Sequence, residues 1–180
     1  MIHYTFAKRF RSLYDKAVTT YRGGRRGAGS FFSTDEEAWL KANGLTPQYL
    51  YDYAEDEVND GEPGYDAALS IELLRRDYFF DEQKGILSTQ VLDEASLPPK
   101  SATARGIEWL PRILPKARAK LRGELPANLM YCCGGDRHFF HTHDIHPHEF
   151  LNLVWRAGND DEMVFEWVAR RAAALKTRTL

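Results

Sequence analysis

Residues 4–22 read YTFAKRFRSLYDKAVTTYR, and this stretch decides the fold class of the N-terminal half. Its hydrophobic side chains recur every three or four positions, which is the spacing of one buried stripe on an α-helix. The stripe comprises Phe6, Phe10, Leu13, Tyr14, Ala17, Val18 and Tyr21. The glycine-rich residues 23–29 then predict a loop. We therefore expect a helix over residues 4–22.

Capping residues, prolines and glycines mark helix boundaries along the rest of the chain. Ser33 is followed three residues later by Glu36, the capping box that begins a helix. Thr46 and Pro47 supply a capping hydroxyl and a first-turn proline for the next helix. Further helices are expected over about 65–83, 110–122 and 135–141, from 146, and after 161. The predicted fold class is all-α, in a compact multi-helix domain.

The two halves of the chain show the same order of helix signals when the first is shifted forward by 100 residues. The matching positions are Lys16 with Lys116, Gly23 with Gly123, Ser33 with Cys133, Thr46–Pro47 with His146–Pro147 and, after a five-residue deletion, Arg76 with Arg171. We therefore predict an internal duplication that gives two similar lobes, residues 1–85 and 107–175, with a connector over 86–106. Chance agreement between two helical stretches is the alternative, because few residues are identical.

Composition excludes several classes of protein. The net charge of −2 lacks the basic excess of proteins that coat nucleic acids. No stretch approaches 18 consecutive apolar residues, so we expect no membrane span. The N-terminus lacks the pattern of a secretory signal, and the only cysteines, Cys132 and Cys133, are adjacent, which disfavours a bridge between them. A reducing, cytoplasmic compartment is expected.

Several short motifs in the C-terminal half match one known family. They are Trp109-Leu110-Pro111-Arg112, Leu121-Arg122-Gly123, Asp136-Arg137, Phe139-Phe140 and the helix from Asp161 to Trp167. Residues 98–170 thereby resemble the bacterial domain-of-unknown-function family numbered 5069. The resemblance implies a small helical fold and no established activity. The chain has Cys133-Gly134-Gly135-Asp136 where the family has a Cys-Pro-Leu-Asp run, and the histidines that follow are not a family hallmark.

The segment from Tyr131 to Phe150 holds both cysteines and five of the six histidines. Neutral imidazole and thiolate are good ligands for zinc and related divalent transition metals. The candidate metal ligands are His138, His141, His143 and His146. Their spacing matches no standard zinc signature, so a histidine-rich polar loop with His146 as a helix cap is the alternative.

Cys133 supports a second catalytic hypothesis, because it lies at the expected N-terminus of a short helix. Unpaired amides at a helix N-terminus favour a thiolate. The candidate catalytic residues are Cys133 as nucleophile, Asp136, Arg137 as charge stabiliser and His138 as base. The alternative is a structural cap, in which Cys133 and Asp136 act as Ser33 and Glu36 do.

Basic residues on the helices are candidates for holding a small anionic ligand. They are Arg22, Arg112, Lys116 and Arg122. Solvated faces paired with the many acidic residues are the alternative. The sequence favours an uncharacterised helical protein that binds a small molecule or acts in regulation. An enzyme that uses the Tyr131–His148 segment, through a metal or through Cys133, and a protein-interaction module remain open.

Overall fold

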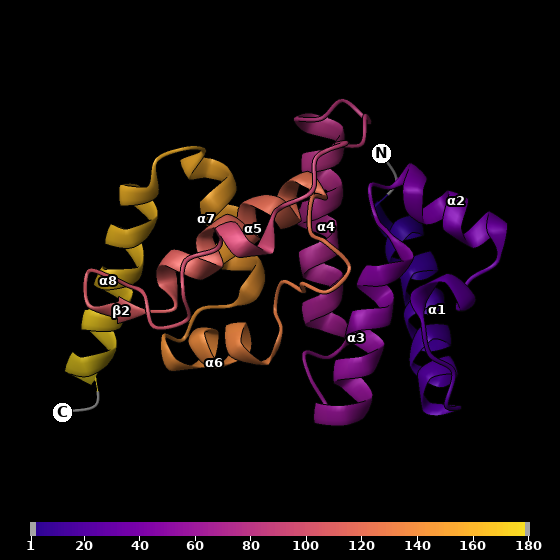
Figure 1. Ribbon diagram of the computed structural model, residues 1–180, viewed down its shortest axis with the longest axis horizontal. Coiled ribbons are helices and arrows are strands. Elements are labelled where there is room, and N and C mark those ends of the chain that lie inside the picture. The colour runs from indigo at the N-terminus through magenta and orange to yellow at the C-terminus, as the bar shows by residue number, and fades with distance from the viewer. Residues whose placement is uncertain (1–2, 179–180) are drawn as a thin grey trace. The chain divides into compact units, whose positions relative to one another are not determined.

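The computed structural model describes residues 3–178 and confirms the predicted all-α class, since these residues form eight α-helices (Figure 1). The strands of this part of the chain are one antiparallel pair of two residues each. The chain divides into two compact units, Met1–Leu87 and Ser88–Leu180. The residues predicted as a connector therefore belong largely to the second unit. No helix within residues 3–178 has the length and apolar composition that crossing a membrane requires.

The first unit contains four helices, and α1 packs mainly against α3. The helices are α1 (His3–Arg22), α2 (Thr34–Ala42), α3 (Pro47–Asp60) and α4 (Tyr65–Asp81), with a short 3-10 helix, η1 (Ala28–Ser30). All seven residues of the predicted stripe on α1 are buried, which confirms the period read from the sequence. Ser33 and Glu36 form the predicted capping box, and the Thr46 side chain caps α3.

The second unit begins with a long irregular segment and ends with four helices. Its elements are η2 (Glu94–Ser96), β1 (Thr103–Ala104), β2 (Ile107–Glu108), α5 (Leu110–Arg122), α6 (Gly134–Thr142), α7 (Pro147–Ala157) and α8 (Asp161–Arg178). In the hairpin, Thr103 pairs with Glu108 and Ala104 with Ile107. Helix α5 packs against α7, and α7 packs against α8.

Helix boundaries in the two units correspond closely in sequence. Helices α2 and α6 begin and end 100 residues apart, and α3 and α7 begin 100 residues apart, each with a proline. Helices α1 and α5 end 100 residues apart, and a glycine follows each. The last helices begin at Tyr65 and Asp161, which is a shift of 96, so a deletion of four residues aligns them rather than the predicted five.

One ion pair occurs at the same two positions of both units. In the first unit, Lys16 Nζ lies 2.5 Å from a carboxylate oxygen of Glu36, and these side chains are 41% and 16% exposed. In the second, Lys116 Nζ lies 2.6 Å from Asp136 Oδ2, and the side chains are 1% and 0% exposed. Each pair joins the first long helix of its unit to the short helix that follows it. The second pair has no solvent to compensate for the loss of either partner.

The difference in burial predicts different effects of the same substitution. Lys116→Met leaves Asp136 as an unpaired buried carboxylate and should lower the free energy of unfolding by about 3–5 kcal/mol. Lys16→Met removes a surface pair and should cost less than about 1 kcal/mol. Urea denaturation followed by circular dichroism measures both values. Equal losses in the two variants would contradict this assignment.

Candidate functional site

A cavity of about 610 Å³ lies within the second unit, where the hairpin, α6 and α8 come together. It is lined by Gly106, Ile107, Glu108 and Trp109 from the hairpin and the residue after it, by Gly135, His138, Phe139, Thr142 and His143 from α6 and its end, and by Ala172, Leu175 and Lys176 from α8. Figure 1 shows β2 and the helices α6 and α8 that border it. Its volume is that of a site for a small organic molecule.

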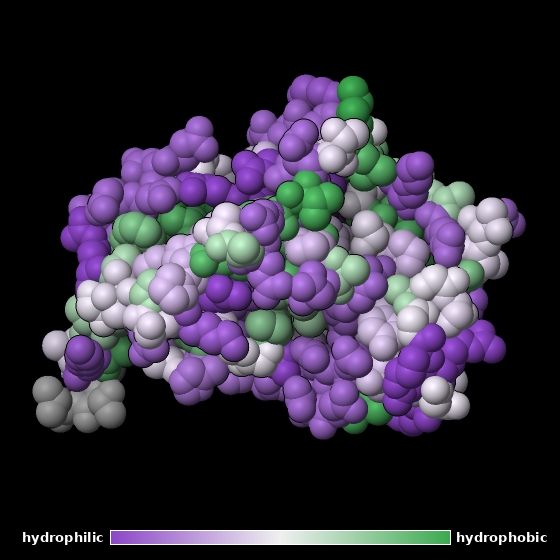
Figure 2. All heavy atoms as spheres, viewed as in Figure 1, coloured by the Kyte–Doolittle hydropathy of each residue, from purple (hydrophilic) through white to green (hydrophobic). Residues whose placement is uncertain are grey.

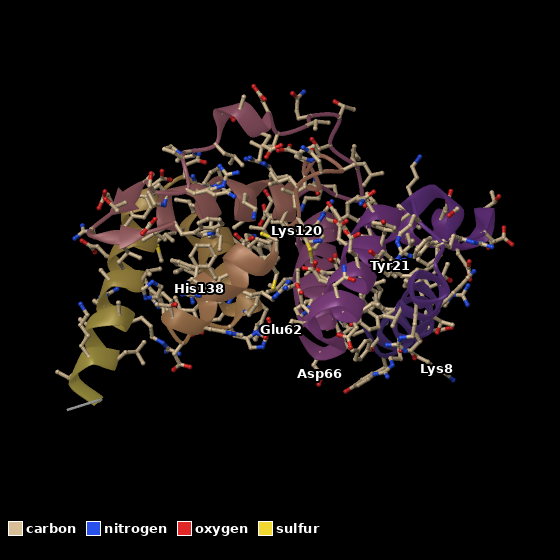
Figure 3. All side chains as sticks on the ribbon, turned by 60° about the horizontal axis from the view of Figure 1, so that its bottom comes forward. Lys8, Tyr21, Glu62, Asp66, Lys120 and His138 are labelled. Atoms are coloured by element: carbon tan, nitrogen blue, oxygen red, sulfur yellow. The ribbon has the colours of Figure 1, made fainter. Side chains whose placement is uncertain are left out.

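Helix α6 lines the cavity because one of its faces is turned toward the hairpin and α8. Gly135, Phe139 and Thr142 are four and three residues apart, which places them on one side of the helix. His138 projects from α6 on the side of α8 (Figure 3). Phe139 is buried, and the rings of Phe139 and His143 meet edge to face with centroids 4.9 Å apart.

The indole of Trp109 lies against the first turn of α6 and forms one side of the cavity. Trp109 has a backbone φ of 70°, in the left-handed region, where the hairpin ends and α5 begins. A Cβ atom on Gly135 would lie 2.5 Å from Cζ2 of this indole, so residue 135 has no room for a side chain. Trp109 Nε1 donates a hydrogen bond of 2.9 Å to Asp136 Oδ1. The adjacent residues 135 and 136 therefore both fix the indole.

Asp136 is the centre of a buried polar network. Its Oδ2 accepts hydrogen bonds from Lys116 Nζ at 2.6 Å and from the backbone N–H of Cys132 at 2.9 Å. Its Oδ1 accepts the bond from Trp109. A buried carboxylate is stable only where such partners replace water. The network therefore ties α5, the turn before α6 and the cavity wall to one side chain.

Three of the four predicted catalytic residues belong to this network rather than to the cavity lining. Cys133 is the N-cap of α6, but its side chain makes no capping hydrogen bond, and its Sγ lies 3.3 Å from Lys116 Nζ. Arg137 is buried and donates to the carbonyl of Cys132 at 3.1 Å. Among the four, only His138 lines the cavity. Asp136 accepts a hydrogen bond from the amide of Cys132, the residue before the N-cap.

The predicted metal ligands are not brought together. Within residues 3–178, no group of three or more His, Cys, Asp or Glu side chains is arranged to hold a metal ion. His138 and His143 line the cavity, His141 is exposed, and Nδ1 of His146 faces Nδ1 of His148 at 2.5 Å. Shared ligand chemistry selected these residues in the sequence, but only His138 and His143 face the same cavity.

The predicted ligand-binding cations do not converge either. Lys116 is paired with Asp136, Arg122 Nε lies 2.8 Å from a Glu124 carboxylate oxygen, and Arg112 donates to the Pro98 carbonyl at 2.9 Å. Arg22 is exposed at the end of α1, in the other unit. None of the four lines the cavity. In the second unit these cations have protein partners, and a role for them in holding an anionic ligand stays a prediction.

His143 has an unusual environment among the cavity residues. Burial lowers the pKa of its imidazole below its ordinary value, and the nearby His138 lowers it further. His143 is therefore neutral near pH 7 and has one ring nitrogen free of a proton, which accepts hydrogen bonds. Sequence reasoning grouped it with metal ligands and overlooked Trp109, Phe139 and Ala172. None of these had a readable signal in the sequence, because the predicted alignment paired Arg76 with Arg171, and only the helix boundaries of the structure pair it with Ala172.

Comparison with known proteins assigns a family to the part of the chain that holds the cavity. Residues 97–179 match the family described as Domain of unknown function (DUF5069). These residues are similar to that family. The match extends over the second unit and includes every residue that lines the cavity, so the predicted resemblance is confirmed. No curated protein and no solved structure matches the chain.

Adjacent glycines in the second unit provide a matched test of the cavity wall. Gly135→Ala places a methyl group inside the contact distance of Trp109, so it should lower the free energy of unfolding by about 1–3 kcal/mol. In Gly134→Ala the new methyl group would lie 3.8 Å from Arg137 Nη2, an ordinary contact. The free energy of unfolding of that variant should equal that of the wild type or exceed it by up to about 1 kcal/mol. Urea denaturation measures the free energy of unfolding of both variants. A Gly135→Ala protein as stable as the wild type would contradict the packing described.

Proposed function

We propose that the second unit binds a small organic molecule in the cavity between the hairpin, α6 and α8. The observation that carries the proposal is the construction of its wall. Trp109 donates a hydrogen bond to Asp136, and its indole packs against Gly135, which has no side chain to displace it. This wall is therefore in place before a ligand arrives. A preformed, largely apolar cavity with a few polar groups is the common form of a small-molecule site.

The cavity lining favours recognition by stacking and hydrogen bonds rather than by strong charge. It includes one lysine, Lys176, and one glutamate, Glu108, both of them exposed. Trp109 and Phe139 supply aromatic surface, and His143 and Thr142 supply hydrogen-bonding groups. The placement of Cys133 outside this lining supports binding over a cysteine mechanism in the same cavity.

The surface gives less support to a protein-interaction module. Hydrophilic residues cover most of the face in Figure 2, and hydrophobic residues occur there in small groups. Within residues 3–178, the exposed large hydrophobic side chains are Tyr4, Ile86, Val91 and Met163. They lie on α1, on the segments after α4 and before η2, and on α8. Protein interfaces generally need a contiguous apolar centre, which scattered residues do not provide.

We also propose that the two units arose by internal duplication. The equal spacing of helix boundaries and the ion pair at corresponding positions support this origin. A duplicated pattern of helix ends together with a side-chain contact is less readily explained by chance than helix ends alone. Cys132 and Cys133 form no disulfide, which supports the expected reducing, cytoplasmic compartment.

Blocking the cavity tests the proposed binding function. Ala172→Trp places an indole in the cavity from α8, whereas Ala173→Trp adds the same group at the next, exposed position. We expect small aromatic fragments to shift the NMR signal of the Trp109 indole N–H in the wild type and in Ala173→Trp. They should fail to do so in Ala172→Trp. Fragment binding that is equal in all three proteins, or absent from the wild type across a broad set, would contradict the proposal.

A further inference from the structure

In the first unit, the residues that correspond to the cavity lining of the second unit are covered by other side chains of the first unit. After the shift of 100 residues, Trp39 corresponds to Phe139, which lines the cavity. The ring of Phe6 stacks on Trp39, with centroids 5.4 Å apart and an angle of 19° between the planes. Phe6 is buried. An aromatic ring therefore covers, in the first unit, the residue whose counterpart faces the cavity in the second.

The guanidinium group of Arg76 also contacts these residues of the first unit. Arg76 Nε donates a hydrogen bond of 2.7 Å to Asn43 Oδ1, and Asn43 corresponds to the cavity residue His143. The Arg76 guanidinium carbon lies 4.8 Å from the centroid of Phe6 and 5.1 Å from that of Phe80. The first unit thus places a flat, nitrogen-bearing cation against the same ring that stacks on Trp39.

The second unit has small residues where the first has these two large ones. By number, Phe6 on α1 corresponds to Gly106, which lies in the turn of the hairpin before α5 begins, and Arg76 corresponds to Ala172 after the observed shift of 96. Gly106 and Ala172 both line the cavity. His143 keeps a hydrogen-bond acceptor where Asn43 accepts from Arg76. The cavity lining therefore lacks the phenyl ring and the guanidinium group that contact the corresponding residues Trp39 and Asn43 in the first unit.

We infer that the cavity takes a planar aromatic molecule that carries an amidine- or amine-type N–H group. Its ring takes the place that the Phe6 ring has in the first unit, and its N–H donates to His143 as Arg76 donates to Asn43. The inference rests on the proposed binding function and on the correspondence of the two units. Glu108 and Lys176 contribute one charge of each sign, so the lining does not oppose a cation.

Benzamidine is the direct probe, because it joins a phenyl ring to a flat, N–H-donating cation. Benzoate is the matched control, because it has the same ring and an anionic group that only accepts hydrogen bonds. In an NMR titration that follows the Trp109 indole N–H, benzamidine should bind with a dissociation constant of about 1 mM, as expected for so small a ligand. Benzoate should bind on the order of tenfold more weakly, because its carboxylate cannot donate to His143.

Variants separate this ligand class from binding in general. Ala172→Arg restores the guanidinium of the first unit and should abolish benzamidine binding, whereas Ala173→Arg adds the same charge at an exposed neighbour and should preserve it. His143→Leu should weaken benzamidine on the order of tenfold and leave benzoate unchanged.

The possible failures of this inference and of the proposed function are distinguishable. Benzoate that binds as tightly as benzamidine, and that Ala172→Trp excludes, overturns the ligand class while the binding function stands. Benzamidine binding that survives Ala172→Arg overturns the inferred location of its cationic group. A wild-type protein that binds neither probe overturns the ligand class. If it also binds no other aromatic fragment, the proposed function fails as well.

Discussion

The buried ion pair between Lys116 and Asp136 is the interaction on which the second unit depends. The pair joins α5 to α6, and it supplies the charge that allows a carboxylate to be completely buried. Because Asp136 is held in this way, its other oxygen is available to fix the indole of Trp109. The corresponding pair of Lys16 and Glu36 is partly exposed and organises no such wall. The same two positions therefore form a partly exposed ion pair in the first unit and a fully buried ion pair, which positions Trp109, in the second.

The cavity follows from this centre together with two small residues. Trp109 closes one side, and Gly106 and Ala172 leave space where the first unit has a phenyl ring and a guanidinium group. Under the proposed duplication, a repeat that is filled by its own side chains in one copy and open in the other gains a site without a change of fold. The packed copy then indicates which chemical groups fit the open one.

The helices were predictable from the sequence because their signals are local. The stripe on α1, the capping box at Ser33 and the proline at position 47 act within one or two turns, and the structure confirms them. The site was not predictable in the same way. Lys116 was selected for its charge, but its burial depends on tertiary packing. The left-handed backbone at Trp109 and the placement of only His138 and His143 at the cavity also depend on how the helices pack, which periodicity does not encode.

The most direct measurement of the central claim is the hydrogen-exchange rate of the Trp109 indole N–H in native protein. If the pair of Lys116 and Asp136 fixes the indole, this proton exchanges slowly in the wild type, because the buried carboxylate accepts it. Replacement of Lys116 by methionine should then accelerate its exchange by more than it accelerates the exchange of the other three indoles. A wild-type rate equal to that of free indole, or a rate that the substitution leaves unchanged, would contradict the account.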